Sequence, residues 1–342
     1  MILDKINQTD IEQIKHLIAD NQTFAITTHY NSDGDAIGSS TALAEVLRQM
    51  GKTVKIVLSN GFPAFFKWMK GTEEILNFER KQKEVSAYLD KADVIICLDM
   101  NQLNRVEKME PIFANCTKPR IVIDHHLGLD IENEAAISVP EASSTCELVY
   151  YVIQMCGLEK YISTDVAESL YTGLITDTGR LDYSSSYADV YQVVGALVEK
   201  GIRKNYIHDK IYNVFTYDRM QLLATVLHDN FVYLPDLHAV YMTISLKDQK
   251  DHNFQLGDSE SFVNYPLMMK DVKVCALFTE YENKTVKVSL RSKRDFSVCD
   301  FAKKYFNGGG HFNASGGKFV GTLQEATETF VQGLRESCRI SL

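Results

Sequence analysis

The chain has 342 residues, which is enough for two domains that each bury a core. Hydrophobic residues make up 45% of it and charged residues 24%, as in ordinary soluble globular proteins. The formal net charge of −9 argues against a protein that follows long nucleic acid, because that task needs a basic face.

Three features of the sequence predict a cytoplasmic protein with no membrane partner. No stretch approaches the ~18 apolar residues that cross a bilayer, and the N-terminus lacks the basic start and apolar run of a secretory signal. The seven cysteines include no C-x-x-C pair. Cys97 and Cys275 lie within apolar, strand-like runs, which is typical of reduced core residues.

Positive charge gathers in residues 270–318, which contain ten Lys/Arg and five acidic residues. That segment carries a formal charge of +5 and the rest of the chain −14. An acidic body with one basic patch suits a small anionic ligand better than a long polyanion.

In the first half of the chain, short apolar strands alternate with helical patterns. Strands are predicted at residues 24–28, 53–58, 94–98 and 120–123, and helices at 36–50, 144–155 and 164–176. The helix at 144–155 opens with Ser144 and Glu147, which resemble a capping box. This alternation predicts an α/β fold with a doubly wound, mainly parallel sheet, in which ligands collect at the carboxyl ends of the strands.

The second half of the chain has a different texture. Residues 188–227 are nearly all helical in pattern, and longer alternating strands follow residue 230, with a hairpin turn at 282–284 and helices at 298–306 and 323–337. We therefore predict an N-terminal catalytic domain, a helical linker and a smaller C-terminal α/β domain with a mixed sheet. Their predicted limits are residues 1–195, 196–228 and 229–342.

The first chemical motif is HYNSDGDAIGSS at residues 29–40, between a predicted strand and a predicted helix. His29, Asp33 and Asp35 are of the residue types that bind manganese, zinc or iron. Gly34 would let the loop curl, so that both carboxylates face one centre. The alternative is a polar loop whose aspartates only cap the next helix.

Further polar side chains stand at the ends of other predicted elements. Asp99 follows the strand VIICL, and Asp124-His125-His126 end the strand RIVI; Asp177 ends a helix in LITDTGR. Asp99 alone could be a turn residue, and the histidines could be a hydrogen-bonded pair at a strand end. Asp177 opposes the helix dipole unless a cation lies nearby.

Taken together, these motifs supply enough ligands for two metal ions that share a bridging carboxylate. The set is Asp33, Asp35, Asp99, Asp124, Asp177, His29, His125 and His126. Two ions ~3.5–4 Å apart can hold a hydroxide and clamp the phosphoryl oxygens of an in-line displacement. No G-x-S-x-G motif or Walker loop offers a competing chemistry.

A second cluster lies near the C-terminus, where RSKR at 291–294 is followed by GGGHFNASGG at 308–317. Glycines let the backbone aim its N–H groups at an anion, and arginine adds bidentate phosphate contacts. The candidate substrate-binding residues are Arg291, Arg294, Gly309, Gly310 and His311. The alternative is a glycine-rich turn beside a solvated basic strand.

With these residues in place, the chain resembles the DHH phosphoesterases. HYNSDGDAIGSS is similar to the first motif of that family, CLDM to the second, IDHH to the motif that names it, and LITDTGR to the fourth. RSKRDFSV with GGGHFNASGG resembles the DHHA1 domain that follows in one branch. GDSESFVNYP at 257–266 resembles a segment of the branch that holds nano-RNases and 3′-phosphoadenosine-5′-phosphate (pAp) phosphatases. The resemblance covers nearly the whole chain, in order.

The resemblance implies a role for each residue. His29 and Asp33 would bind one metal, Asp35, His125 and Asp177 the other, and Asp99 would bridge the two. Asp124 would orient a histidine, and His126 would contact the scissile phosphate and protonate the leaving oxygen. Arg291 and His311 would hold the other phosphate or the nucleotide of the substrate.

Two positions depart from the pattern of the family. Ser32 stands where proline is frequent, and Ser261 replaces a frequent glycine. Neither change removes a ligand, so both bear on the subfamily more than on the chemistry.

The implied activity is hydrolysis of short nucleotide phosphoesters by a water activated by two metals, of which manganese is the usual one in this family. Substrates would be short RNA or DNA oligonucleotides, linear pApA or pAp, and long duplexes would not fit a cleft closed by two domains. The polarity of exonuclease action stays open, and a homodimer would be unsurprising.

Three alternatives remain open. A phosphoanhydride hydrolase acting on polyphosphate or pyrophosphate would use the same metal site, although Tyr305, Phe306 and Phe312 near the glycine run favour a base. A cyclic di-AMP phosphodiesterase would normally carry membrane and sensory segments. A nucleotide-binding module that has lost catalysis should lack one or more metal aspartates, and here the set is complete.

Overall fold

The structure is a computed structural model that describes residues 1–183 and 187–340. The chain divides into two compact units, unit 1 (Met1–Val214) and unit 2 (Phe215–Leu342). The division falls inside the stretch 196–228, for which the sequence predicts a helical linker. This stretch contains the end of α7 (Ala188–Glu199), all of α8 (Lys204–Ile211) and all of α9 (Tyr217–His228), so it is helical in three pieces. The predicted domain limits stay a prediction.

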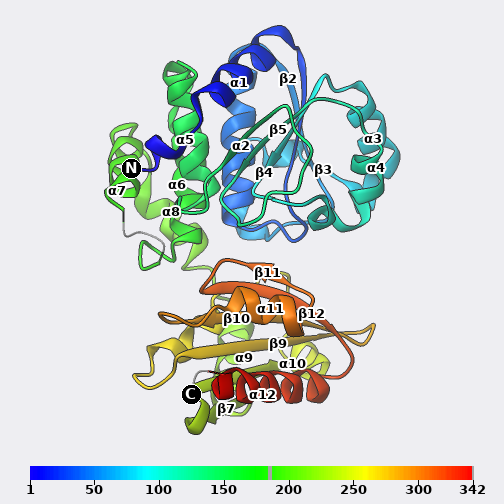
Figure 1. Cartoon of the computed structure of the whole chain (residues 1–342), viewed down its shortest axis with the longest axis vertical. Coiled ribbons are helices and arrows are strands. Elements are labelled where there is room, and N and C mark those ends of the chain that lie inside the picture. Colours follow the sequence, from blue (N-terminus) through cyan, green and yellow to red (C-terminus); the bar gives the residue numbers. More distant parts are fainter. Residues whose placement is uncertain (184–186, 341–342) are drawn as a thin grey trace. The chain divides into compact units, whose positions relative to one another are not determined.

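A parallel sheet forms the centre of unit 1, and β2, β3, β4 and β5 of this sheet are labelled in Figure 1. Its six strands lie in the order β3-β2-β1-β4-β5-β6. Its strands are β1 (Thr23–Thr27), β2 (Thr53–Leu58), β3 (Leu76–Asn77), β4 (Val94–Leu98), β5 (Arg120–Asp124) and β6 (Ala135–Ser138). The predicted doubly wound parallel sheet is confirmed. The strands at 53–58 and 94–98 have the predicted limits, and β1 and β5 differ from prediction by one residue at their ends.

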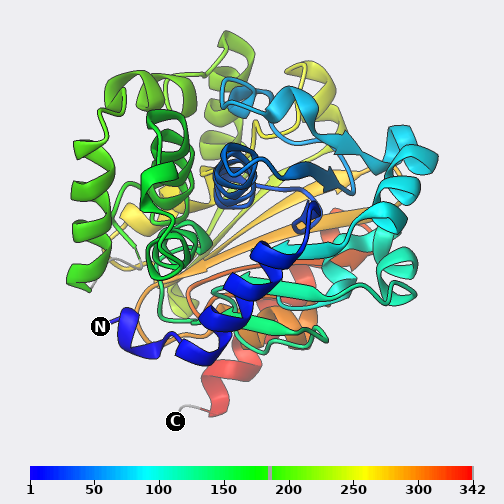
Figure 2. The ribbon, with the colours of Figure 1, turned by 90° about the horizontal axis from the view of Figure 1, so that it is seen from above.

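Helices cover both faces of this sheet because successive strand residues point to opposite faces. In β1, Phe24 and Ile26 pack on one side and Ala25 on the other. The first side is covered by α1 (Gln8–Asp20), α2 (Gly34–Gln49), α5 (Thr145–Met155), α6 (Thr164–Asp177) and α7. The second side is covered by α3 (Phe78–Lys91), the 3₁₀ helix η4 (Leu103–Met109) and α4 (Glu110–Ala114). Figure 2 shows α3 and α4 in cyan on the side of unit 1 opposite the green α5, α6 and α7.

The strand order of unit 1 reverses between β1 and β4, which are neighbours although β2 and β3 lie between them in sequence. In doubly wound sheets, ligands bind at the carboxyl ends of the strands beside such a reversal. The loops that follow β1, β4 and β5 meet at this edge and contain the motifs that begin at His29, Asp99 and Asp124.

Unit 2 is built on a mixed six-stranded sheet, in the order β11-β12-β10-β9-β8-β7. Its strands are β7 (Phe231–Leu234), β8 (Ala239–Ile244), β9 (Val274–Tyr281), β10 (Thr285–Ser292), β11 (Gly309–Gly310) and β12 (Ala314–Val320). Only β8 and β9 pair in parallel. The predicted hairpin turn at 282–284 joins β9 to β10, with Lys284 in the left-handed region at φ 55°.

Helices also cover both faces of the unit 2 sheet. On one face lie α11 (Val298–Tyr305) and α12 (Leu323–Ile340), and on the other lie α9 and the 3₁₀ helix η7 (Phe262–Met268). A short helix, α10 (Leu246–Asp251), follows β8. The cysteines whose side chains the structure describes are free, and Cys97 and Cys275 are buried as predicted. Within the described residues, no helix is long and apolar enough to cross a membrane.

Candidate active site

The loop between β1 and α2 places the first set of candidate ligands. One carboxylate oxygen of Asp33, Oδ1, accepts hydrogen bonds from the backbone N–H of Asp35 (3.0 Å) and Ala36 (3.1 Å), and so caps α2. The other oxygen, Oδ2, lies 3.8 Å from His29 Nε2. The capping role and the ligand role that the sequence offered as alternatives are therefore compatible in one side chain.

Two features hold this loop in shape. Asn31 has a left-handed backbone (φ 57°), and its main chain and side chain both pair with the side chain of Asn60, at 2.9 and 2.7 Å. Gly34 has no positive φ, so curling of the loop is not what requires glycine there. A Cβ at position 34 would lie 2.2 Å from Thr176 Oγ1, so glycine is needed because α2 packs tightly against α6.

Asp99 lies between two groups of candidate metal ligands. One of its oxygens, Oδ2, lies 3.3 Å from His29 Nε2, and the other, Oδ1, lies 3.5 Å from His125 Nε2. His29, Asp33 and Asp99 form one group whose ligand atoms lie within 4.8 Å of one another, and Asp35, His125 and Asp177 form a second. The two oxygens of a single carboxylate thus face two different groups, which is the arrangement that a bridging ligand needs.

The N-terminus of α5 holds two of these carboxylates in place. Asp35 accepts hydrogen bonds from the backbone N–H of Thr145 (2.6 Å) and Cys146 (2.8 Å), where unpaired N–H groups and the helix dipole favour an anion. The Thr145 hydroxyl donates to Asp99 Oδ1 at 3.1 Å. The fully buried Thr145 was not a candidate from the sequence, since a threonine after a capping serine looks like ordinary helix-start composition.

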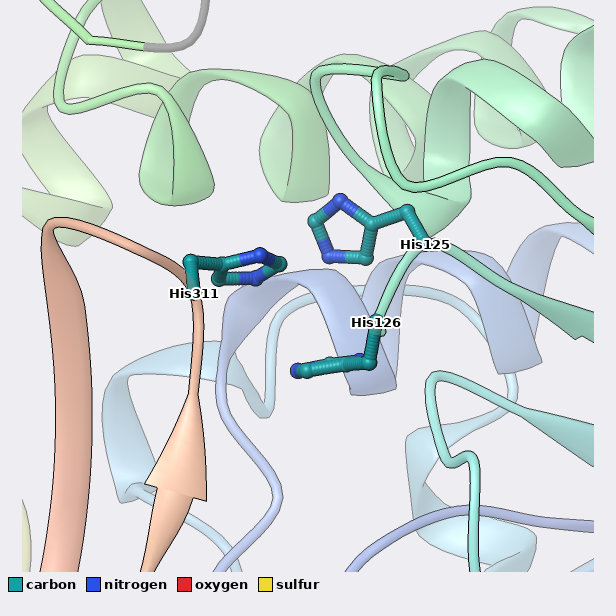
Figure 3. A group of neighbouring side chains, drawn as sticks. All are labelled: His125, His126 and His311. Atoms are coloured by element: carbon teal, nitrogen blue, oxygen red, sulfur yellow. The ribbon is translucent and has the colours of Figure 1, made fainter. Parts of the chain in front are cut away.

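Asp124, His125 and His126 end β5, and Figure 3 shows the two histidine side chains leaving adjacent positions of the chain. Asp124 accepts from the His126 backbone N–H (2.9 Å) and lies 2.8 Å from the His126 ring Nδ1. Both oxygens of the buried Asp124 carboxylate therefore fix the orientation of His126. The His125 ring places Nδ1 3.2 Å from the Ala142 carbonyl and turns Nε2 toward Asp35, Asp99 and Asp177.

The pKa values of the two candidate ligand histidines, His29 and His125, are both raised by nearby carboxylates. Burial disfavours the charged form of His29, but hydrogen bonds to Asp33 and Asp99 outweigh it and raise the pKa to about 10. Burial likewise opposes protonation of His125, but the nearby carboxylates, Asp177 foremost, raise its pKa well above its ordinary value of 6.5. Each imidazole takes up a proton because the carboxylates around it need a cation.

The pKa values of the neighbouring aspartates are shifted as well. Burial, reinforced by the charges of Asp99 and Asp177, raises the pKa of Asp35 well above its ordinary value of 3.8. Burial also opposes ionisation of Asp99, but hydrogen bonds from His125 and His29 hold its pKa well below that value. Buried aspartates and imidazoles without a matching number of basic side chains are the donor set that divalent transition metals bind, so the residues fit two such ions.

His126 behaves differently from the other two histidines. Burial and the charge of Arg105 lower its pKa, although the hydrogen bond to Asp124 opposes the shift. Its imidazole is therefore neutral at pH 7 in the free protein, with Nδ1 turned to Asp124. An anionic phosphate beside the ring would favour the protonated form again.

The candidate substrate-binding residues lie together at one end of the unit 2 sheet. Arg291, half-buried on β10, pairs in register with Ala314 of β12, beside the turn that carries His311. The His311 backbone N–H donates to the Ala314 carbonyl at 2.8 Å, and its carbonyl accepts from Ser315 Oγ at 2.8 Å. His311, the third side chain labelled in Figure 3, is thus held by a tight turn of unit 2.

Glycine has a defined purpose in that turn. Gly310 has φ 137°, and a Cβ there would lie 2.7 Å from the Ala314 carbonyl oxygen. A Cβ at Gly309 would meet nothing within 4 Å, so this position leaves the backbone open to approach. Arg294 is exposed and left-handed (φ 57°), and its carbonyl accepts from Asn313 Nδ2 at 3.0 Å.

The three aromatic residues near this turn differ in their surroundings. Phe306 is buried in the core of unit 2, and the Tyr305 hydroxyl donates to Glu336 at 2.6 Å. Phe312 is 45% exposed. Of the three, Phe312 is therefore the one whose ring is available to stack on a base.

Comparison with known proteins identifies two family domains in the chain. The DHH family N-terminal domain matches residues 23–174, and the DHHA1 domain matches residues 236–339. The first match spans all six strands of the unit 1 sheet and ends three residues before Asp177. The chain belongs to the DHH family, in the branch that carries a DHHA1 domain.

Curated relatives are similar along most of their length. The bifunctional oligoribonuclease and PAP phosphatase NrnA of Thermus thermophilus is 27% identical, over 91% of this chain and 89% of that protein. The protein of the same name from Mycoplasma genitalium is 29% identical, over 84% of this chain and 86% of that protein.

Solved structures show the same fold. An exopolyphosphatase-related protein from Bacteroides fragilis is 39% identical, with a TM-score of 0.90 and 97% of each chain covered. RecJ from Thermus thermophilus, in complex with Mn²⁺, is 12% identical with a TM-score of 0.52, over 97% of this chain and 54% of that one. The RecJ likeness bears on the fold alone.

Proposed function

We propose that this chain is a metal-dependent phosphoesterase that hydrolyses short oligoribonucleotides, linear pApA and pAp. The observation that carries the proposal is the pair of ligand groups in unit 1 with the two oxygens of Asp99 between them. The names of the curated relatives, oligoribonuclease and PAP phosphatase, support this substrate class.

We assign one metal ion to each of the two groups of candidate ligands. His29 and Asp33 would hold one ion, Asp35, His125 and Asp177 the other, and Asp99 both. Two divalent cations, for which we propose manganese, would activate water as a nucleophile and neutralise the phosphoryl oxygens.

The remaining residues would position the substrate. Asp124 fixes the ring of His126, which would contact the scissile phosphate and hold a proton for the leaving oxygen. In unit 2, Arg291 and His311 would bind the second phosphate or the nucleotide, with Arg294, Gly309 and Gly310 beside them. Orientation, rather than bond breaking, would be the contribution of these unit 2 residues.

A release assay tests the proposal directly. Purified, metal-stripped protein would be supplied with Mn²⁺ and offered pAp, pApA, a pentanucleotide RNA, a long single-stranded RNA and polyphosphate in parallel. We expect fast turnover of the short nucleotides and little of the other two. The matched control is Asp99→Ala, for which turnover of more than a few per cent of the wild-type rate would contradict the bridging role.

Hydrolysis of polyphosphate is the second candidate function. It is favoured by the exopolyphosphatase-related protein that is 39% identical over 97% of this chain. Turnover of polyphosphate alone in the same assay would establish it, and absence of turnover on every substrate would point to a nucleotide-binding module.

A further inference from the structure

Arg105 lies beside the candidate active site but belongs to none of the motifs named above. It stands on η4, six residues after Asp99. Its carbonyl accepts from the Tyr30 backbone N–H at 2.7 Å, and the next carbonyl, of Val106, accepts from Ser59 Oγ at 2.5 Å. The main chain at Arg105 is therefore tied to the loop that carries His29.

Arg105 is half-buried, and its guanidinium group makes little use of its N–H donors in the described part of the chain. Nη1 donates to the Asp99 carbonyl at 3.4 Å, a long hydrogen bond at the weak end of the range. In residues 1–183 and 187–340, the structure gives this group no ion pair with a carboxylate and no second hydrogen bond. Since a guanidinium has five N–H donors, most of them are left for another acceptor.

The positive charge of Arg105 lies near the histidines of the candidate active site. The positive charge of Arg105 disfavours protonation of both His29, which lies beside Asp33, and His126, which lies beside Asp124. Yet the aspartates there are engaged with histidines and backbone N–H groups, not with Arg105. An arginine held at an acidic site without a carboxylate partner is suited to an anion that comes and goes.

The charge balance of the candidate site also favours an anion-binding role for Arg105. The five aspartates of the site outweigh two divalent cations by one negative charge, and an anionic phosphate would approach against it. Arg105 cancels that difference.

We propose that Arg105 binds a non-bridging oxygen of the scissile phosphate and stabilises the charge that develops there in the transition state. This inference rests on the proposed phosphoesterase function and adds a substrate-binding residue to it. A guanidinium fork matches two phosphoryl oxygens, and donors aimed at developing charge contribute most when they are held in advance. The backbone bonds of η4 fix the main chain from which this side chain extends.

Lys108 offers a matched control on the same element. It is exposed and pairs with Glu79 at 2.9 Å, so its removal changes the net charge by the same amount without touching the site. The test compares Arg105→Ala, Arg105→Lys and Lys108→Ala with the wild type. For each, kcat and KM are measured on pAp and pApA, together with Mn²⁺ retention, the melting temperature, and the calorimetric affinity of the Mn²⁺-loaded protein for inorganic phosphate.

We expect Arg105→Ala to lower kcat by about 10²–10³-fold, as loss of one such donor does elsewhere. Its phosphate affinity should fall about tenfold or more, since a charged hydrogen bond is worth about 1.5–3 kcal/mol. Arg105→Lys should recover part of both losses, and Lys108→Ala should match the wild type, with Mn²⁺ retained in all variants.

Arg105→Ala values for kcat and phosphate affinity that match those of Lys108→Ala would overturn the inference. If the wild type turns over no substrate, the proposed function fails, and the phosphate affinities alone decide the role of Arg105. If the alanine variant does not fold, the lysine variant decides, because it keeps the charge and loses only the fork.

Discussion

Replacing Gly173 with alanine in the middle of α6 should destabilise unit 1, although alanine is the better helix former. Ordinarily this exchange would gain about 1 kcal/mol. Here the new Cβ would lie 2.3 Å from Cys146 Sγ, 2.9 Å from the Asp35 Cα and 3.0 Å from Asp35 Oδ1. The thiol can turn aside, but the backbone of α2 cannot move without displacing Asp35.

The magnitude follows from these contacts. Overpacking of a filled core costs about 1–3 kcal/mol, and a clash with backbone belongs at the upper end of that range. Net of the gain in helix propensity, Gly173→Ala should lower the free energy of unfolding by about 2 kcal/mol. Retention of Mn²⁺ should fall as well, since Asp35 and Asp177 come from the two helices that would be pushed apart.

Gly195 is the matched control, because it is also within a helix, α7, and a Cβ there meets nothing within 4 Å. Gly195→Ala should stabilise unit 1 by about 0.5–1 kcal/mol. The sole tryptophan, Trp68, lies in unit 1, so its fluorescence during urea unfolding reports on that unit. A Gly173→Ala protein as stable as the wild type, or a Gly195→Ala protein less stable than it, would refute the packing argument.

Three further outcomes are expected. Thr145→Val should lower kcat about tenfold or more by removing the hydroxyl that donates to Asp99, while Thr145→Ser should restore it; equal kcat values for the two would contradict the positioning role. Glu168 is buried, which favours its neutral form, but hydrogen bonds from Arg203 at 2.7–2.9 Å outweigh burial and lower its pKa below the ordinary 4.5. This pair therefore stabilises the fold above pH 4.5, and the contribution is lost as the pH falls through the lowered value. Urea midpoints of Glu168→Gln should be lower than wild type at pH 7 and depend less on pH in acid, whereas parallel pH profiles would count against it. His311→Ala should raise KM several-fold for pAp with little change in kcat, and an unchanged KM would remove His311 from substrate binding.

How much could be predicted from sequence depends on the range of the interactions involved. Local sequence patterns are enough to predict the strands of unit 1 and the residues at their ends. The apolar runs therefore predict β1, β4 and β5 together with the motifs that follow them. The capping box at the start of α5 was only half right: Ser144 Oγ accepts from Glu147 N–H at 3.0 Å, but the Glu147 carboxylate accepts from Ser143 N–H at 2.7 Å. Glu147 is buried, and its carboxylate bonds the N–H one residue before the capping serine, which the local pattern does not predict.

The residues that were missed act across long distances in the sequence. Thr145 contacts Asp99, 46 positions away, and Asn60 pairs with Asn31, 29 positions away. Neither residue type is unusual where it stands, so no local pattern marks it. Gly34 was singled out correctly but for the wrong reason, because the tight approach of α6 is a tertiary contact.

Asp33 combines a helix-capping role with the proposed role of a metal ligand, and this combination bears on how such proteins evolve. One oxygen closes the first turn of α2 and the other faces the ligand group. Asparagine caps helices about as well as aspartate but is a poorer ligand for a divalent cation. Under the proposed function, Asp33→Asn would therefore silence catalysis at little cost in folding, and a single-base change is enough to make this substitution. Such a change would be a short evolutionary path from a hydrolase to a nucleotide-binding protein.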